Sequence, residues 1–299
     1  MKYKFLNTLG ILILFTIVFV PSKIFAATIN ISSGSLVNKG DTSVIDIYLN
    51  TEGQNINSLD GSISLSDDHG GNFEVKDLSL SNSVFTMWPR KPSLEDGQKI
   101  SFVGGVPGGI NGDRMLLFKV IVKINQAGDF KITPKNLTAY LNDGLGTSIK
   151  IAENSSTILI SEAQGDPKDK WEEIVSNDNV APEPFEIILT KDPNLFNGKK
   201  FILFDTTDSQ SGISYYEVRE DGYPPVRASG NYVLINQEKD VDIIVTAYDK
   251  AGNFQVATLQ MKGGINWIGI LIALAVIIIS YQVIKRVINK KKKHAKKNS

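Results

Sequence analysis

The chain has 299 residues, with 32 Lys and Arg against 32 Asp and Glu, so its formal charge is zero. It contains no Cys, which excludes disulfide scaffolds, Cys nucleophiles, thiolate zinc sites and a lipid-modified Cys. Its two His, His69 and His294, are too few for a metal site with several His ligands.

The charges are sorted along the chain. Residues 1–26 carry three Lys and no acid, and residues 285–299 carry eight basic residues and no acid. The segment between them holds all 32 acids and 21 bases, a net charge of −11. Such sorting is typical of a chain that crosses a membrane. A segment this acidic is a poor candidate for binding nucleic acid, so we expect no nucleic-acid partner.

Residues 1–26 have the layout of a secretory signal peptide. Lys2 and Lys4 precede an apolar run from Leu9 to Val20, and small residues stand at Ala26 and Ala27. We expect cleavage after Ala26. An uncleaved N-terminal anchor is the alternative.

Residues 27–161 show short alternating runs separated by Gly, Asn, Asp and Ser. β-Branched and aromatic residues dominate these runs, and no window of helical length has a 3.6-residue period. The pattern predicts a β-sandwich or jelly roll. Its nine expected strands are Thr28–Ile31, Val44–Leu49, Gly61–Leu65, Phe73–Leu80, Lys99–Val103, Leu116–Ile124, Phe130–Thr133, Leu137–Leu141 and Ser156–Ile160.

Residues 162–184 break this pattern with charged residues, Asn and Pro, and we interpret them as a linker in which Trp171–Val175 could form one helical turn. Residues 185–262 then predict a smaller, immunoglobulin-like β-sandwich. The Asp249–Asn253 segment predicts a tight turn, with Gly252 and Asn253 at positive φ. The expected strands are Phe185–Leu189, Lys200–Phe204, Ile213–Arg219, Tyr232–Ile235, Val241–Tyr248 and Phe254–Met261.

Residues 265–284 predict one transmembrane helix. The run from Trp267 to Ile284 has no charge, and about 20 helical residues span about 30 Å of hydrocarbon. The basic segment 285–299 predicts a cytoplasmic tail, which places the preceding domains outside a plasma membrane that the chain crosses once. A nucleic-acid arm is the alternative for the tail, but contact with anionic lipid suits its position better.

The first predicted sandwich resembles a cohesin domain, within the fold group that also contains bacterial cellulose-binding modules. The resemblance covers about 135 residues and rests on the order and spacing of several segments. These are Thr28–Ile31, Gly40-Asp41, Val44–Leu49, Asn57–Leu65, Ser83–Trp88, the glycine-rich Lys99–Gly112, Leu116–Val122, Ala127-Gly128 and Tyr140–Thr147. The second sandwich is similar to bacterial immunoglobulin-like repeats found next to the membrane, through Asp208–Val218 and Ala247–Asn253.

The cohesin resemblance implies a non-catalytic module that binds a dockerin-like protein or serves adhesion. A dockerin needs calcium loops with an Asp-x-Asn/Asp-x-Asp series, which this chain does not supply, so the partner belongs to another polypeptide. Recognition residues vary among cohesins, and none is transferred here.

Carbohydrate binding is the alternative function, because sugar rings stack on exposed aromatic side chains. Phe85, Trp88 and Tyr140 are the candidate ligand-binding residues of the first sandwich. A β-sandwich normally buries its Trp, which favours a structural role for Trp88 over a sugar platform.

Catalysis and metal binding have weaker signals. Acid pairs such as Asp67-Asp68 and Glu172-Glu173 suit a glycosidase only in a fixed geometry, which no motif supplies, so we expect no enzyme and no catalytic residue. The oxygen-rich loops Asn142–Thr147 and Asp205–Gly212 could hold calcium, but such residues also build turns without a metal. The sequence therefore predicts no cofactor, with calcium as the alternative.

Overall fold

A computed structural model describes residues 27–33, 37–67, 73–163, 165–238, 241–260, 275–278, 281 and 285. The predicted signal peptide, His69, His294 and nearly all of the predicted membrane helix and tail lie outside these residues. Within the described part of the chain, no helix has the length and apolar character needed to cross a membrane.

Strands β1 to β11 build the first sandwich from two sheets. Its small sheet has the order β1 (Thr28–Ser32), β3 (Thr42–Asn50), β8 (Met115–Ile124) and β5 (Phe73–Ser79). Its large sheet has the order β2 (Val37–Asn38), β11 (Ser156–Ser161), β9 (Gly128–Leu141), β4 (Ile56–Asp67), β7 (Lys99–Ile110) and β6 (Met87–Glu95), with β10 (Ser148–Lys150) beside β9. The predicted all-β class is confirmed for the described residues.

Alternating side chains from the two sheets fill the core between them. Ile45, Ile47 and Leu49 of β3 are buried while the residues between them are half-buried, which is the period of two that a strand with one core face requires. Aromatic rings continue the core across the sheets, with centroids 5.0 Å apart for Phe102 and Phe118 and 6.4 Å apart for Phe102 and Trp88.

The glycine at position 104 makes room for these rings. A Cβ atom added to Gly104 would lie 2.6 Å from two ring carbons of Trp88 and 2.8 Å from Phe85. Part of the glycine-rich strand noted in the sequence therefore has a packing role.

The structure differs from the predicted strands in two instructive places. Strand β6 was not predicted, because it contains Pro89 and Pro92 and proline has no amide hydrogen to donate to a neighbouring strand. The strand lies at the edge of the large sheet and pairs irregularly with β7, so it can accommodate both prolines. Strand β9 is one element where two were predicted, because Pro134 and Lys135 stay paired with Ile63 and Ser62 of β4.

Seven short strands build the second sandwich. One sheet has the order β12 (Ile188–Lys191), β13 (Lys200–Leu203) and β16 (Asn231–Val233). The other has the order β15 (Val226–Ala228), β14 (Ile213–Glu220), β17 (Ile243–Asp249) and β18 (Phe254–Leu259), and a 3-10 turn, η1 (Phe196–Gly198), precedes β13. Ile202, Val218, Ile243 and Val245 are fully buried in the core between these sheets.

The predicted turn between the last two strands is present, with one correction. The amide of Asp249 donates to the carbonyl of Asn253 at 3.0 Å, and Gly252 has a φ of +94°. Asn253 does not adopt positive φ; its side-chain amide instead donates to Asp249 Oδ2 at 2.8 Å. The asparagine therefore closes the turn through its side chain.

A buried carboxylate organises the end of β14. Glu220 is 1% exposed, and it accepts hydrogen bonds from Tyr232 Oη at 3.1 Å, the Ile235 amide at 2.8 Å and the Asn236 amide at 2.7 Å. Burial, followed by the charge of Glu220, raises the pKa of Tyr232 to about 12. The tyrosine hydroxyl therefore remains a hydrogen-bond donor to Glu220 at neutral pH.

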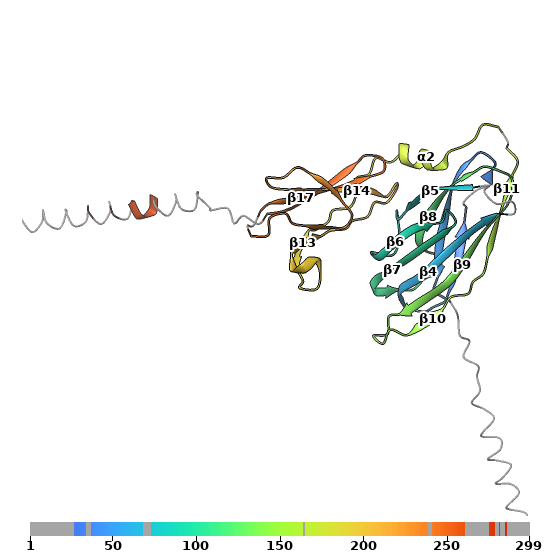
Figure 1. Ribbon diagram of the computed structural model, residues 1–299, viewed down its shortest axis with the longest axis horizontal. Helices are drawn as coiled ribbons and strands as arrows, with labels where there is room; N and C mark the ends of the chain where they lie inside the picture. Colours follow the sequence, from blue (N-terminus) through green and yellow to red (C-terminus); the bar gives the residue numbers. More distant parts are fainter. Residues whose placement is uncertain are drawn as a thin grey trace, which may run out of the picture.

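The connecting segment, residues 162–184, contains one short helix, α2 (Lys170–Ser176), in place of the single turn predicted at Trp171–Val175. Asp169 caps it by accepting from the amides of Trp171 at 3.0 Å and Glu172 at 2.9 Å. Figure 1 shows α2 between the two sandwiches, above the small sheet.

This segment covers part of the outer surface of the small sheet. The Thr42 amide donates to the Lys168 carbonyl at 2.8 Å, and Asp41 Oδ1 accepts from the Lys168 amide at 2.8 Å. Ile121 is fully buried although its neighbours on the strand, Val120 and Val122, belong to the core. Because strand neighbours point to opposite faces, Ile121 must be buried under atoms outside the sandwich core.

Candidate functional site

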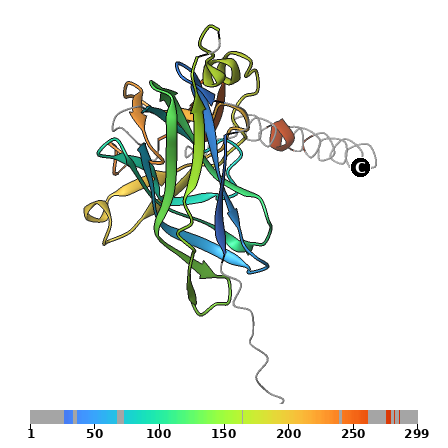
Figure 2. The ribbon, with the colours of Figure 1, turned by 90° about the vertical axis from the view of Figure 1, so that its right-hand side faces the viewer.

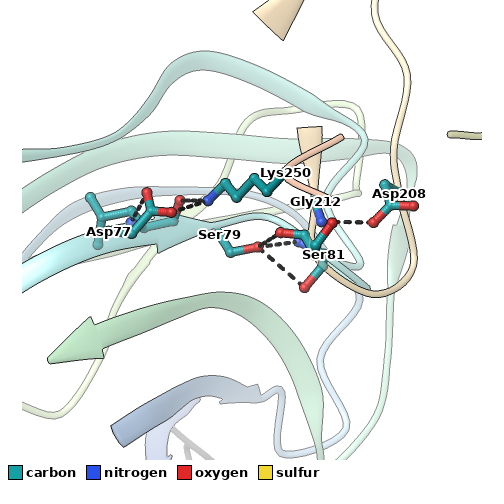
Figure 3. A network of polar contacts seen from close by, with 8 residues as sticks. Asp77, Ser79, Ser81, Asp208, Gly212 and Lys250 are labelled. Carbon is teal, nitrogen blue, oxygen red and sulfur yellow. Dashed lines mark hydrogen bonds and ion pairs between the residues drawn. The ribbon is translucent and has the colours of Figure 1, made fainter. Parts of the chain in front are cut away.

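Hydrogen bonds and ion pairs join the two sandwiches at the β5 and β6 edges of the first (Figure 3). Ser79 Oγ donates to the Ser211 carbonyl at 3.1 Å, and Asn82 Nδ2 donates to the Ser209 carbonyl at 2.6 Å. Lys250 Nζ pairs with Asp77 and also donates to the Leu78 carbonyl at 3.1 Å. Lys91 of β6 forms an ion pair with Asp205 of the second sandwich at 3.3 Å. We call this set of contacts the junction.

Gly212 of the second sandwich lies close to Ser79 and Ser81 of the first at the junction. Its φ is +84°, and an added Cβ would lie 2.6 Å from Ser79 Oγ. The position therefore requires glycine twice over, once for its backbone conformation and once for the space between the sandwiches.

A cavity of 330 Å³ lies beside the junction and takes its walls from both sandwiches. Two of the three predicted ligand-binding residues, Phe85 and Trp88, line it on the first-sandwich side. Tyr215 and Tyr216 line it on the other, together with Asp205, which forms an ion pair with Lys91 at 3.3 Å. Sequence reasoning missed these second-sandwich residues, because nothing local in the sequence places them beside Trp88.

The three predicted aromatic residues do not form one site. Phe85 is fully buried and packs edge-on against Trp88, with ring centroids 5.5 Å apart. Its ring is therefore part of the hydrophobic core and is not exposed for stacking on a sugar. Tyr140 lies elsewhere, on the outer surface of the large sheet, opposite Ser58 of β4 and Ser148 of β10. Ligand binding by Phe85, Trp88 and Tyr140 remains a prediction.

The outer surface of the large sheet is the second feature of functional interest. On β4, Leu59, Ile63 and Leu65 are buried in the core, so Asp60, Ser62 and Ser64 point away from it. We call the outward residues of the four strands β6, β7, β4 and β9 the open face. They combine hydroxyl groups with long and charged side chains: Met87, Arg90, Ser93, Glu95, Lys99, Ser101, Val103, Ser58, Asp60, Ser62, Ser64, Ser66, Lys131, Thr133, Lys135, Thr138 and Tyr140.

The strand register places these hydroxyl groups in rows across the sheet. Ser62 lies opposite Ser101, and Ser64 lies opposite Thr133 on one side and Lys99 on the other. Asp60 lies between Thr138 and Val103. Ser62 and Ser101 are only 5% and 3% exposed, so neighbouring side chains cover this pair, whereas Ser58, Ser64, Thr133 and Thr138 are half-buried and within reach of solvent.

The described contacts of the rest of the chain leave the open face uncovered. Helix α2 packs against β3 of the small sheet, and the junction uses residues of β5, β6 and the segment between them. Figure 1 shows β9, β4, β7 and β6 side by side with the second sandwich beyond β6, and Figure 2 views the molecule from the end of the first sandwich.

Sequence reasoning could identify part of the open face but not its extent. The alternation of Asn57–Leu65 shows which side chains of one strand point outward. The sequence does not show that β7 and β9 flank β4, and this pairing is what joins the hydroxyl groups of three strands into one surface.

No protein-family model and no curated protein matches the sequence. Among solved structures, the chain is similar to a cohesin module from a family 33 glycoside hydrolase of Clostridium perfringens, at 14% identity and a TM-score of 0.37, over 46% of this chain and 98% of that one. It is similar to a chain of a type I cohesin–dockerin complex from Clostridium thermocellum at 13% identity, with a TM-score of 0.38, over 46% and 95% of the two chains. A chain of the CaDoc0917–CaCohA2 complex is 21% identical, with a TM-score of 0.36, over 45% of this chain and 100% of that one.

Proposed function

We propose that this chain is a non-catalytic surface protein whose first sandwich binds a protein partner through the open face. The observation that carries the proposal is the difference between the two outer surfaces of that sandwich. The connecting segment packs on the small sheet, whereas the described contacts leave the large sheet with a broad polar outer surface of hydroxyl and charged side chains, in which Ser62 and Ser101 are covered by their neighbours. The partner we propose is a dockerin-like module on another polypeptide, as the cohesin-like order of segments implies.

The chemistry of the open face suits a folded protein partner. A protein interface makes about one hydrogen bond per 100–200 Å², and Ser, Thr and Tyr hydroxyls can both donate and accept. Their positions are fixed by strands whose other side packs in a full core, so little order has to be gained on binding. Adhesion to a different surface protein would use the same groups.

The second sandwich acts in this proposal as an immunoglobulin-like spacer. Strand β18 ends at Leu259, and five residues separate it from the predicted membrane helix at 265–284, so the second sandwich lies between that helix and the first sandwich along the chain. The junction fixes the first sandwich against the spacer, which presents the open face in a defined direction. The charge sorting and the apolar run support a plasma-membrane location with both sandwiches outside and the basic tail inside.

The experiment is binding of purified full-length protein to a panel of dockerin modules, measured by surface plasmon resonance. We expect at least one dockerin to bind, and Ser64→Trp to weaken its affinity at least 100-fold, because the new ring projects from the open face between β7 and β9. The matched control is Asn30→Trp. Asn30 is exposed between the core residues Ile29 and Ile31, on the outer surface of the small sheet. We expect the Asn30→Trp substitution to change the affinity for the dockerin less than twofold.

Three results would contradict the proposal. One is failure of every dockerin to bind, and another is equal loss of binding in Ser64→Trp and Asn30→Trp. The third is binding of a glycan, lost in Trp88→Ala, in the absence of any protein partner. That result would favour the cavity lined by Phe85 and Trp88 and a carbohydrate-binding function.

A further inference from the structure

Three buried aspartates meet beside the junction, and the open face does not involve them. Asp178 follows helix α2, Asp208 lies in the loop between β13 and β14, and Asp249 ends β17. Each contributes a carboxylate oxygen to a group whose members all lie within 4.8 Å of one another. The exposed fractions of the three residues are 7%, 1% and 2%.

Backbone amides fix the orientation of the carboxylates. Asp178 accepts from the amides of Val180 and Ser211, both at 3.0 Å. Asp208 Oδ1 accepts from the amides of Gln210 at 3.0 Å and Gly212 at 2.7 Å. The Asp249 carboxylate accepts from the amide and the side chain of Asn253, both at 2.8 Å.

Two oxygens at this place have no hydrogen-bond partner. Among the described residues, Asp208 Oδ2 and Ser211 Oγ are the buried side-chain atoms that lack one. Leaving a buried polar atom unpaired costs about 1–3 kcal/mol, and a charged one costs more. The fold supplies two amide donors to Asp208 Oδ1 and none to Oδ2, so Oδ2 is held in place for a partner outside the chain.

The charges at the cluster point to a cation. The ion pairs of the described residues do not include Asp178, Asp208 or Asp249, and the nearest lysine in sequence, Lys250, reaches to Asp77 instead (Figure 3). Burial raises the pKa of Asp208, and the charges of Asp178 and Asp249 raise it further. Three buried carboxylates without a counter-charge are unfavourable, and a divalent cation at their centre would offset this repulsion.

The donor set selects the cation. All the ligands are oxygen atoms, which hard cations prefer over the nitrogen and sulfur ligands of zinc. Calcium accepts irregular sets of six to eight oxygens at about 2.3–2.6 Å, so two of its ligands are at most about 5 Å apart. The 4.8 Å limit on the aspartate oxygens fits within this span. Magnesium requires a smaller and nearly octahedral set.

We propose that Asp178, Asp208 and Asp249 bind one calcium ion that fixes the connecting segment, the β13–β14 loop and the β17–β18 turn to one another. These segments also carry the junction: the Ser209 and Ser211 carbonyls accept from Asn82 and Ser79, and Lys250 reaches Asp77 and Leu78. The ion therefore sets the shape of the surface that docks against the first sandwich. This site is independent of the partner proposed for the open face.

The test is calcium binding by purified full-length protein after treatment with EDTA, by isothermal titration with calcium chloride and by thermal unfolding. We expect one calcium ion per chain and a midpoint of unfolding that is higher with calcium than with EDTA. Asp208→Asn keeps the Oδ1 acceptor but removes the charge, so it should bind calcium at least tenfold more weakly. In EDTA this variant should be at least as stable as the parent, because it relieves the repulsion.

The matched control is Asp143→Asn. Asp143 also accepts a loop amide, that of Leu145 at 2.9 Å, but it is exposed and lies in the other oxygen-rich loop of the sequence. We expect this variant to bind calcium as the parent does. The proposal is wrong if the parent shows no stoichiometric binding and no calcium-dependent shift, or if Asp208→Asn retains full affinity. Equal affinity for magnesium chloride would overturn the assignment to calcium.

Discussion

Gly212→Val is expected to separate the two sandwiches and to lower the free energy of unfolding by about 3 kcal/mol. A β-branched residue is a conformational outlier at a φ of +84°, which costs about 1–2 kcal/mol. Its Cβ would also collide with Ser79 Oγ, and overpacking of this kind costs about 1–3 kcal/mol. Moving the loop away removes the hydrogen bond from Ser79 to the Ser211 carbonyl.

Gly222→Val separates these two effects, because Gly222 has nearly the same φ, +86°, with no atom within 4 Å of an added Cβ. It should share the backbone strain and leave the junction intact. Small-angle X-ray scattering of the full-length protein should show a larger radius of gyration for Gly212→Val alone. An unchanged radius in Gly212→Val, or an equal increase in both variants, would mean that the junction does not hold the sandwiches together.

Glu220→Ala is expected to destabilise the second sandwich by about 3 kcal/mol or more. The substitution removes three hydrogen bonds to a buried carboxylate and leaves the amides of Ile235 and Asn236 without their acceptor. Hydrogen bonds to charged groups contribute about 1.5–3 kcal/mol each, and loss of a buried network is among the few causes of large destabilisation. The effect should be confined to the second sandwich, because every partner of Glu220 belongs to it.

The measurement is urea denaturation of the full-length protein, with hydrogen–deuterium exchange to locate the change. We expect faster exchange in β14 and β17 of Glu220→Ala and unchanged exchange in β4 and β9. Glu217→Ala provides the comparison on the same strand. Glu217 is half-buried, so this substitution should lower the free energy of unfolding by less than about 1 kcal/mol. A loss below 1 kcal/mol in Glu220→Ala would show that Glu220 does not organise this end of the sandwich.

The strands with a clear period of two could be predicted from the sequence, and those that depend on pairing could not. The alternation in β3 and the long β-branched run in β8 are local properties, so both strands were found close to their true bounds. Strand β6 carries two prolines and gains its structure only from β7, so its own residues predict a loop. Short strands such as β10 and β15 likewise depend on a neighbouring strand for their definition.

The functional features follow the same division. The outward serines of β4 were visible in the sequence, but the open face requires the pairing of β4 with β7 and β9. One loop considered for calcium, Asp205–Gly212, contains Asp208, but its two partner carboxylates lie 30 residues before and 41 residues after it. No local motif joins three such positions, because the turn and the connecting segment meet only in the folded chain.

The most direct test of the account is hydroxyl-radical footprinting of the full-length protein with and without a bound dockerin. Met87 is 54% exposed and lies on the open face with Tyr140, whereas Phe254, 57% exposed, lies on the second sandwich. We predict that dockerin lowers the oxidation rates of Met87 and Tyr140 several-fold and leaves that of Phe254 unchanged. Unchanged rates at Met87 and Tyr140 in the complex, with protection at another surface, would contradict the assignment of the open face as the binding surface.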